Sequence, residues 1–316
     1  MRIVTTTRRR AVLAVAALLA SAASGPVAIA ATTDVAQEAA ARSPWALGYP
    51  EVEIVVGPDG IEAPAALPAG HVVFTLVPEG PNLAGLTLLR PPAGMPESEI
   101  VANIPAAISE DVALPGWVYA GGVEAMEPGE PESFVVDLVP GEYRLATTWR
   151  DAEDMEAAPT VSSATLTVAR PASGPEATAA AREAAPAATV RLEMTDDLAY
   201  LLVPSPLPAG PQVWEIANTG TLQAHHAVLM RVPDGTTAEQ VVAESGAMMT
   251  GAAPAPDGVF AQAMPAGYAG MQTGGITTWA EFDFEPGTYA VICFIADPAT
   301  GHPHVMEGMV SVFTVA

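Results

Sequence analysis

The sequence predicts an all-β protein built from two similar, sandwich-sized domains. Short apolar runs rich in β-branched and aromatic residues alternate with turns rich in Pro, Gly and Asp along the 316 residues, a pattern typical of strands. The same plan occurs twice, since the Leu-Pro-Ala-Gly of residues 67–70 recurs at 207–210, and residues 140–147 match 286–293. Repetition on this scale indicates a tandem repeat of one domain.

The first 30 residues have the pattern of an export signal. Residues 1–10 are basic, residues 11–20 are apolar, and Ala28 and Ala30 form a small-residue cleavage site. The apolar stretch is too short for a membrane span, so no stable span is expected after signal removal. The arginines before residue 11 partly match a twin-arginine signal, and the general route is equally compatible. We therefore expect an exported protein that is extracellular, periplasmic or at the cell surface.

Two domains and a linker follow the signal. The first domain is predicted over residues 44–170 and the second over residues 189–316. Between them, residues 171–188 are rich in Ala, Pro and Glu and lack apolar periodicity, as is typical of a linker. One short helix after a turn is expected in each domain, over residues 96–107 and residues 236–246.

The charge of the chain excludes acidic partners. The formal net charge is −24 at pH 7, and every one of the 12 basic residues is Arg. A surface this negative repels nucleic acid and anionic membranes. We therefore expect no nucleic acid as a partner.

The candidate functional site lies in residues 287–316. The apolar run of residues 289–295 predicts a buried strand, and it carries Cys293, the only cysteine of the chain. In an oxidising compartment a lone thiol is expected to be either buried or bound to a metal. The following loop contains two imidazoles and two thioethers, from His302, His304, Met306 and Met309. Thiolate, thioether and imidazole ligands together suit copper.

This segment resembles the ligand loop of the cupredoxins, the blue copper protein family. In that family a strand ends in a Cys ligand, the loop supplies a His ligand, and a Met ligand begins the closing strand. Cys293, His304 and Met309 stand in that order. The family's remaining ligand is a His at the start of an upstream strand, and His225 matches it because it follows the turn of residues 218–224.

The resemblance implies two tandem cupredoxin-like Greek-key β-sandwiches, with one copper ion in the C-terminal domain. It implies His225, Cys293 and His304 as strong ligands and Met309 as a weak axial ligand, an arrangement that accepts both Cu(I) and Cu(II). The implied function is one-electron transfer through a type 1 copper site, with a redox partner protein of unknown identity.

Three further residues are alternative ligands. His226 could replace His225, but alternation along a strand would place the two rings on opposite faces. His302 with Met306 is the second choice in the last loop, although Met306 would then lie outside the closing strand.

The first domain lacks these ligands. Gly85 and Leu86 stand where the second copy has its histidine pair, and Thr147 stands where it has Cys293. The corresponding loop, residues 150–163, contains no His. The first domain is therefore predicted to be without a copper site.

Two other functions stay possible. A non-metal structural or cell-surface interaction module is one, because the first domain suggests that the fold persists without ligands. A Cu(I) chaperone is the other, because thioethers bind Cu(I) and the second domain has further methionines, namely Met230, Met248, Met249, Met264 and Met271.

No enzyme is expected. The chain contains neither a Gly-x-Ser-x-Gly nucleophile motif nor a Walker-type phosphate loop. Multicopper oxidases and copper nitrite reductases use related domains, but they need extra His residues to build a second copper centre.

Overall fold

The computed structural model of the protein describes residues 48–109, 112–154, 157–170, 184–249 and 255–316. The predicted export signal, residues 1–30, lies outside the described residues, as does most of the predicted linker. The described residues belong to one compact unit, Ala39–Ala316. None of the helices in these ranges is long and apolar enough to cross a membrane.

Strands are the predominant regular elements of the described chain. The first half contains β1 (Glu51–Gly57), β2 (Gly60–Glu62), β3 (Ala66–Pro68), β4 (Gly70–Pro78), β5 (Leu83–Arg90), α2 (Glu97–Ala107), β6 (Val118–Glu124), β7 (Glu132–Leu138), β8 (Gly141–Arg150) and β9 (Thr160–Ala169). The second half contains β10 (Val190–Thr195), β11 (Ala199–Val203), β12 (Gly210–Asn218), β13 (His225–Val232), α4 (Ala238–Met249), α5 (Val259–Gln262), β14 (Met264–Gln272), β15 (Thr277–Phe284), β16 (Gly287–Ile292), the 3-10 helix η2 (His304–Glu307) and β17 (Val310–Val315). The predicted all-β class is confirmed.

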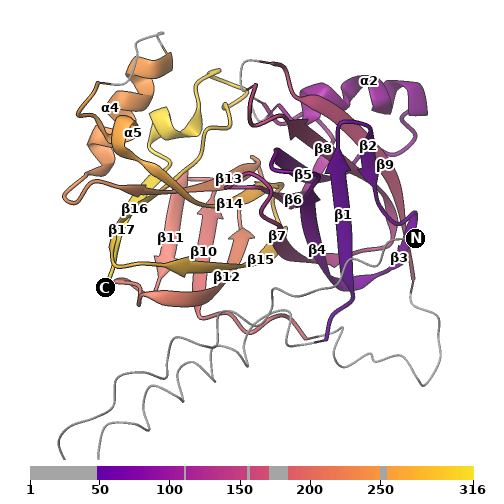
Figure 1. Cartoon of the computed structure of the whole chain (residues 1–316), viewed down its shortest axis with the longest axis horizontal. Helices are drawn as coiled ribbons and strands as arrows, with labels where there is room; N and C mark the ends of the chain where they lie inside the picture. Colours follow the sequence, from indigo (N-terminus) through magenta and orange to yellow (C-terminus); the bar gives the residue numbers. More distant parts are fainter. Residues whose placement is uncertain (1–47, 110–111, 155–156, 171–183, 250–254) are drawn as a thin grey trace, which may run out of the picture. The chain divides into compact units, whose positions relative to one another are not determined.

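The strands form two sheets, here called sheet I and sheet II (Figure 1). Sheet I has the order β11-β10-β12-β15-β7-β4-β1-β2, and sheet II has the order β17-β16-β13-β14-β6-β5-β8-β9-β3. In each sheet the strands of the second half come first in this order and the strands of the first half follow. Each half therefore contributes strands to both sheets, so that each half has the two layers of a sandwich.

The two halves repeat one pairing scheme. In the first half β1 pairs with β4 in parallel and with β2 antiparallel, and in the second half β10 pairs with β12 in parallel and with β11 antiparallel. Likewise β5 lies between β6 and β8, as β13 lies between β14 and β16. The predicted pair of β-sandwiches is therefore confirmed.

Both predicted short helices are present as α2 and α4. The helix α2 directs Ile100, Ile104 and Ala107 into the core, at the spacing that puts residues on one helical face. Glu97 and Glu99 lie in its first turn, where negative charge is favourable. The sequence analysis did not predict α5, because four residues are too few for a recognisable periodicity.

Each half has an apolar core between its two layers. In the first half Phe74 of β4 and Phe134 of β7 stack with ring centroids 5.7 Å apart, and both are fully buried. In the second half the fully buried Trp214 of β12 contacts Phe284 of β15 and Phe313 of β17. The Phe74–Phe134 pair lies within sheet I, whereas the Trp214–Phe313 contact joins sheet I to sheet II in the second half.

The two halves join edge to edge in both sheets, which the sequence did not predict. In sheet I, β15 pairs antiparallel with β7, and Trp279 stands opposite Val135. In sheet II, β14 pairs antiparallel with β6, and Gln272 stands opposite Ala120. Strands that would otherwise be unpaired edges thereby find hydrogen-bond partners.

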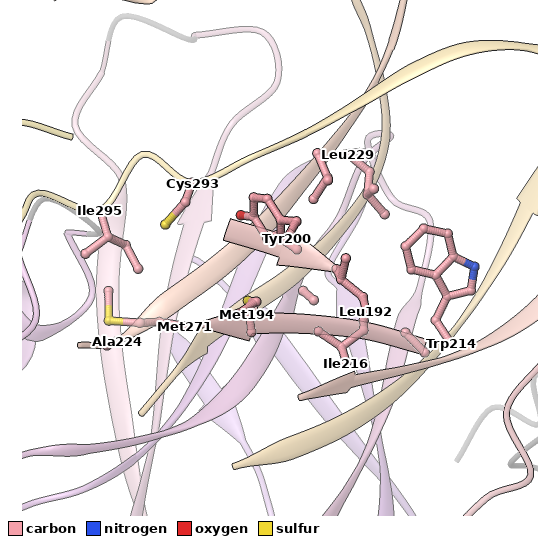
Figure 2. Close-up of a cluster of buried hydrophobic side chains, with 14 of the residues drawn as sticks. Leu192, Met194, Tyr200, Trp214, Ile216, Ala224, Leu229, Met271, Cys293 and Ile295 are labelled. Carbon is pink, nitrogen blue, oxygen red and sulfur yellow. The ribbon is translucent and has the colours of Figure 1, made fainter. Parts of the chain in front are cut away.

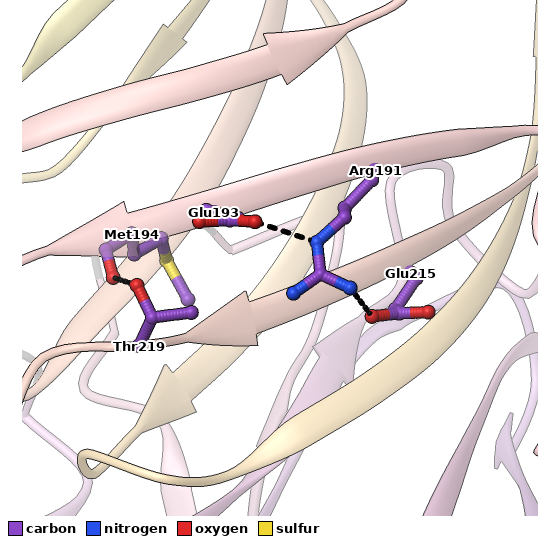
Figure 3. Close-up of polar contacts among 5 residues, drawn as sticks. All are labelled: Arg191, Glu193, Met194, Glu215 and Thr219. Carbon is purple, nitrogen blue, oxygen red and sulfur yellow. Dashed lines mark hydrogen bonds and ion pairs between the residues drawn. The ribbon is translucent and has the colours of Figure 1, made fainter.

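An ion-pair cluster lies on the exposed side of sheet I. Arg191 Nε donates to Glu193 Oε1 at 2.7 Å, and an Arg191 terminal nitrogen donates to Glu215 Oε1 at 2.6 Å (Figure 3). Arg191 and Glu215 are register partners in the parallel β10–β12 pair. Exposed pairs of this kind contribute at most about 1 kcal/mol, so the cluster favours this register without dominating stability.

Candidate metal centre

Cys293 stands one residue beyond the end of β16. The predicted strand of residues 289–295 therefore ends earlier than expected, at Ile292. Two backbone bonds hold Cys293: its N–H donates to the Met309 carbonyl at 3.3 Å, and its carbonyl accepts from the Val305 N–H at 2.8 Å. These two bonds join the backbone before the loop to the backbone after it at Cys293.

His304 begins η2 and is held by the same loop. Its N–H donates to the Ile295 carbonyl at 2.8 Å, and its carbonyl accepts from the Met309 N–H at 2.9 Å. Gly308 ends η2 with φ of 106°, a backbone conformation that residues other than Gly rarely adopt. This turn returns the chain toward Cys293, so that the Met309 carbonyl accepts from Cys293 and the Met309 N–H donates to His304.

His225 is the first residue of β13, and the loop before it is fixed by Asn218. The Asn218 side-chain amide donates to the carbonyls of Gln223 at 2.9 Å and Gln272 at 2.8 Å. The Thr219 hydroxyl donates to the Met194 carbonyl at 3.3 Å, which ties the loop to β10 (Figure 3). The loop is therefore bonded to sheet I on one side and to sheet II on the other.

The structure brings His225, Cys293 and His304 together. The Nδ1 atoms of the two imidazoles are 3.1 Å apart, Cys293 Sγ is 3.4 Å from His304 Nδ1, and the three ligand atoms all lie within 4.8 Å of one another. Two atoms at about 2.0 Å from one ion with a trigonal angle are about 3.5 Å apart, given usual metal–nitrogen distances. The three side chains are 0%, 0% and 1% exposed, so the cluster is closed to bulk solvent.

Met309 lies in the same apolar cluster as Cys293 and is fully buried. Figure 2 shows part of this cluster, with Cys293, Ile295 and Met271 toward one end, Trp214 at the other, and Met194 in between. Burial in this cluster is compatible with the prediction of Met309 as a weak thioether ligand, which stays a prediction.

The three alternative ligands lie elsewhere. His226 Nε2 accepts the Phe294 N–H at 2.8 Å, so this ring supports the backbone beyond Cys293. His302 is exposed. Met306 packs in a separate apolar cluster with Val241 and Ile292. Neither His226 nor His302 belongs to the group of converging His, Cys, Asp and Glu ligand atoms found in the described residues.

Burial keeps the imidazoles neutral. Desolvation, with a smaller contribution from the positive form of His304, lowers the pKa of His225 to about 4. Desolvation lowers the pKa of His226 to about 3, and it also lowers the pKa of His304 below its ordinary value. Neutral imidazole is the form that binds metal ions, so at pH 7 these nitrogens do not need to lose a proton first.

The Tyr200 hydroxyl lies beside the thiol. It donates to the His226 carbonyl and points toward the Cys293 end of the cluster (Figure 2). Burial, together with the neighbouring Cys293 thiol, raises the pKa of Tyr200 well above its ordinary value, so it stays a neutral donor. Tyr200 was not predicted as a site residue, because nothing in the pattern of β11 distinguishes it from a core aromatic.

Two further polar residues of the site were not predicted. Gln223 Nε2 donates to Asp297 Oδ2 at 2.8 Å and so joins the loop before His225 to the loop after Cys293. The other Asp297 oxygen accepts from the Ala299 N–H at 2.6 Å. The Asp-Pro turn marked the position of Asp297, but its partner could not be recognised without the fold.

Searches of solved structures found copper proteins at low similarity. Auracyanin B is 24% identical, with a TM-score of 0.26, over 40% of this chain and 86% of that protein. An auracyanin from Roseiflexus castenholzii is 22% identical, with a TM-score of 0.25, over 40% and 94%. A multicopper oxidase is 12% identical, with a TM-score of 0.22, over 84% and 88%. Neither a family profile nor a curated protein sequence matches the chain.

Because these TM-scores are low, the metal assignment rests on the donor atoms of the site and the distances between them. One thiol and two imidazoles converge in the buried interior, at spacings compatible with three bonds to one ion. Soft sulfur combined with imidazole nitrogen is the donor set of type 1 copper centres. The cluster of His225, Cys293 and His304 therefore fits a type 1 copper site.

Proposed function

We propose that the protein is an exported copper protein that carries out one-electron transfer at the cluster of His225, Cys293 and His304. The convergence of these three donor atoms within 4.8 Å, in a buried site, carries the proposal. Met309 is proposed as the weak axial ligand, because it is buried in the cluster that contains Cys293. The proposed partner is a redox protein of unknown identity.

Copper bound at this site would supply a one-electron couple between Cu(I) and Cu(II). The role of the protein is to hold the donors in one arrangement that serves both states. Backbone hydrogen bonds fix Cys293 and His304 relative to each other, and Asn218 fixes the loop that leads into His225. Burial excludes water from the thiolate and the imidazoles, so fewer groups have to rearrange when the charge changes.

Export and domain organisation complete the proposal. The signal pattern of residues 1–30 supports export to the periplasm, the cell surface or the exterior. We propose residues 44–170 as a domain without copper ligands and residues 189–316 as the copper domain. The repeated strand pairing supports an origin by tandem duplication, with residues 171–188 as the connection.

The dispersed methionines favour electron transfer over Cu(I) chaperoning. Met248 and Met264 are exposed, Met271 is buried in the core, and Met230 packs in the cluster with Val241. These thioethers lie in different parts of the second half, whereas a Cu(I) site needs several at one point.

The experiment is a copper-loading and redox cycle on the full chain. Cu(II) is added, the visible spectrum and the copper content are recorded, and the protein is reduced with ascorbate and reoxidised with ferricyanide. We expect an intense thiolate-to-copper band at one copper per chain that bleaches and returns with the copper retained. Oxygen uptake and nitrite consumption are measured in the same samples, so that an oxidase or nitrite reductase activity would be detected.

The other outcomes separate the alternatives. Colourless protein that retains Cu(I) would support a chaperone, and protein that binds no copper would support a non-metal module. Sustained turnover of oxygen or nitrite would identify an enzyme. Any of these results would overturn the electron-transfer proposal.

A further inference from the structure

The first half of the chain borders the candidate site at its histidine ligand. In sheet II, β14 lies between β13 and β6. Gln272, the last residue of β14, stands opposite His225 on one side and opposite Ala120 on the other. Gln272 is therefore the single residue between the proposed ligand His225 and Ala120 of the first half in this row of paired residues.

The residue after Gln272 is clamped by the first half. The Tyr119 N–H donates to Thr273 Oγ1 at 2.8 Å, and the Thr273 N–H donates to the Tyr119 carbonyl at 2.9 Å. Tyr119 is itself fully buried and belongs to the apolar cluster that contains Cys293 and Met309. These two hydrogen bonds fix the position of Thr273, because Tyr119 is itself held by close packing in the core.

The backbones of the two halves approach so closely here that only glycine fits. A Cβ atom placed on Gly270 would lie 2.7 Å from the nitrogen and 2.8 Å from the Cα of Gly122. Such distances are too short for real contacts, so a side chain on Gly270 would push β14 away from β6. The contact between the halves is therefore a close-packed interface at the level of the main chain.

Asn218 passes this constraint on to the ligand loop. Its side-chain amide donates to the Gln272 carbonyl at 2.8 Å and to the Gln223 carbonyl at 2.9 Å. Its backbone carbonyl accepts from the Gly275 N–H at 2.8 Å, and its backbone N–H donates to the Ile276 carbonyl at 3.0 Å. The turn after Thr273 and the loop before His225 are consequently one hydrogen-bonded unit, and Asn218 is buried with its groups satisfied.

We infer that the first half acts as a positioning wall for the copper site, and that Thr273 is the positioning residue through which Tyr119 holds the His225 loop. The inference rests on the proposed function for its copper readout, but the rigidity of the loop is a property of the metal-free chain. On this inference, the first half helps to position a copper ligand of the second half. Groups that orient a ligand change metal affinity by about 10-fold to 100-fold when removed.

Thr273→Val tests this, since valine keeps the shape and removes the acceptor of the Tyr119 N–H. In the metal-free full chain, amide hydrogen exchange of residues 219–226 is expected to accelerate by about 10-fold or more. In the copper-loaded chain, release of copper to a chelator is expected to accelerate about 10-fold, with a displaced charge-transfer band and a changed reduction potential. Thr273→Ser keeps the hydroxyl and is expected to restore wild-type behaviour in every measurement.

Thr288→Val is the matched control, because Thr288 Oγ1 donates at 2.9 Å to Asp234 at the surface and has no bond to the site loop. All variants are compared below their melting temperatures, so that a change in global stability is not mistaken for a change in the loop. Unchanged exchange in residues 219–226 of the Thr273→Val protein would overturn the inference, whether or not the chain binds copper. A wild-type chain without colour but with accelerated exchange in this variant would refute the proposed function and leave the positioning role standing.

Discussion

Replacing Cys293 by serine is expected to abolish the visible charge-transfer band and to weaken copper binding by at least about 100-fold. The lower bound follows because loss of a mere supporting group already costs about 10-fold to 100-fold. A serine hydroxyl does not ionise at neutral pH, so it offers no soft anionic donor at the point where the two imidazoles converge. Visible absorption and competition with a chelator measure the two effects.

Thr147→Ser is the matched control for this substitution. Thr147 stands at the position of Cys293 in the first repeat, and it is equally buried, at 1% exposure. This change is expected to leave the band and the copper affinity unaltered. Copper binding of wild-type strength by the Cys293→Ser protein would mean that the metal binds elsewhere in the chain.

Acidification is expected to destabilise the metal-free protein through its buried imidazoles. The pKa values of His225 and His226 are lowered by burial to about 4 and about 3, against about 6.5 in the unfolded chain. Between these values the unfolded state binds more protons, so the free energy of unfolding falls as the pH falls below about 6.5. Each fully shifted histidine contributes a slope of about 1.4 kcal/mol per pH unit, and the loss ends below the folded-state pKa.

A comparison with His226→Gln isolates the effect from the titration of the many carboxylates. Glutamine can accept the Phe294 N–H that His226 Nε2 accepts, but it cannot take up a proton on unfolding. Urea unfolding of metal-free protein between about pH 5 and pH 6.5 should show an average slope smaller by about 1 kcal/mol per pH unit in the variant, because the unfolded imidazole is only partly protonated near pH 6.5. Equal slopes in the wild-type and variant proteins would show that His226 is not held neutral.

The local features of the fold could be predicted because each depends on a few neighbouring residues. Pro-Gly turns, apolar runs and the repeated Leu-Pro-Ala-Gly indicated the strands and their duplication. The order of Cys293, His304 and Met309 in one loop, and of His225 after a turn, placed four candidate ligands in two segments. The structure brings Cys293, His304 and His225 into one cluster. Met309 is buried in the apolar cluster that contains Cys293.

The joining of the two halves could not be predicted, because a strand that pairs with another domain has the same alternation as an edge strand. Gly270 and Gly122 are each compatible with an ordinary bend in a strand, and only their close approach shows why both are glycine. The same holds for Asn218, Gln223 and Asp297, whose roles arise from partners far away in the sequence. Long-range polar contacts leave no periodic signal in the chain.

The most direct test of the central claim is a crystal structure of the copper-loaded full chain with anomalous scattering recorded at the copper absorption edge. The account predicts one strong anomalous peak per chain, bonded to Cys293 Sγ and to the Nδ1 atoms of His225 and His304. A peak at the exposed His302 or at any other position, with this cluster empty, would contradict it.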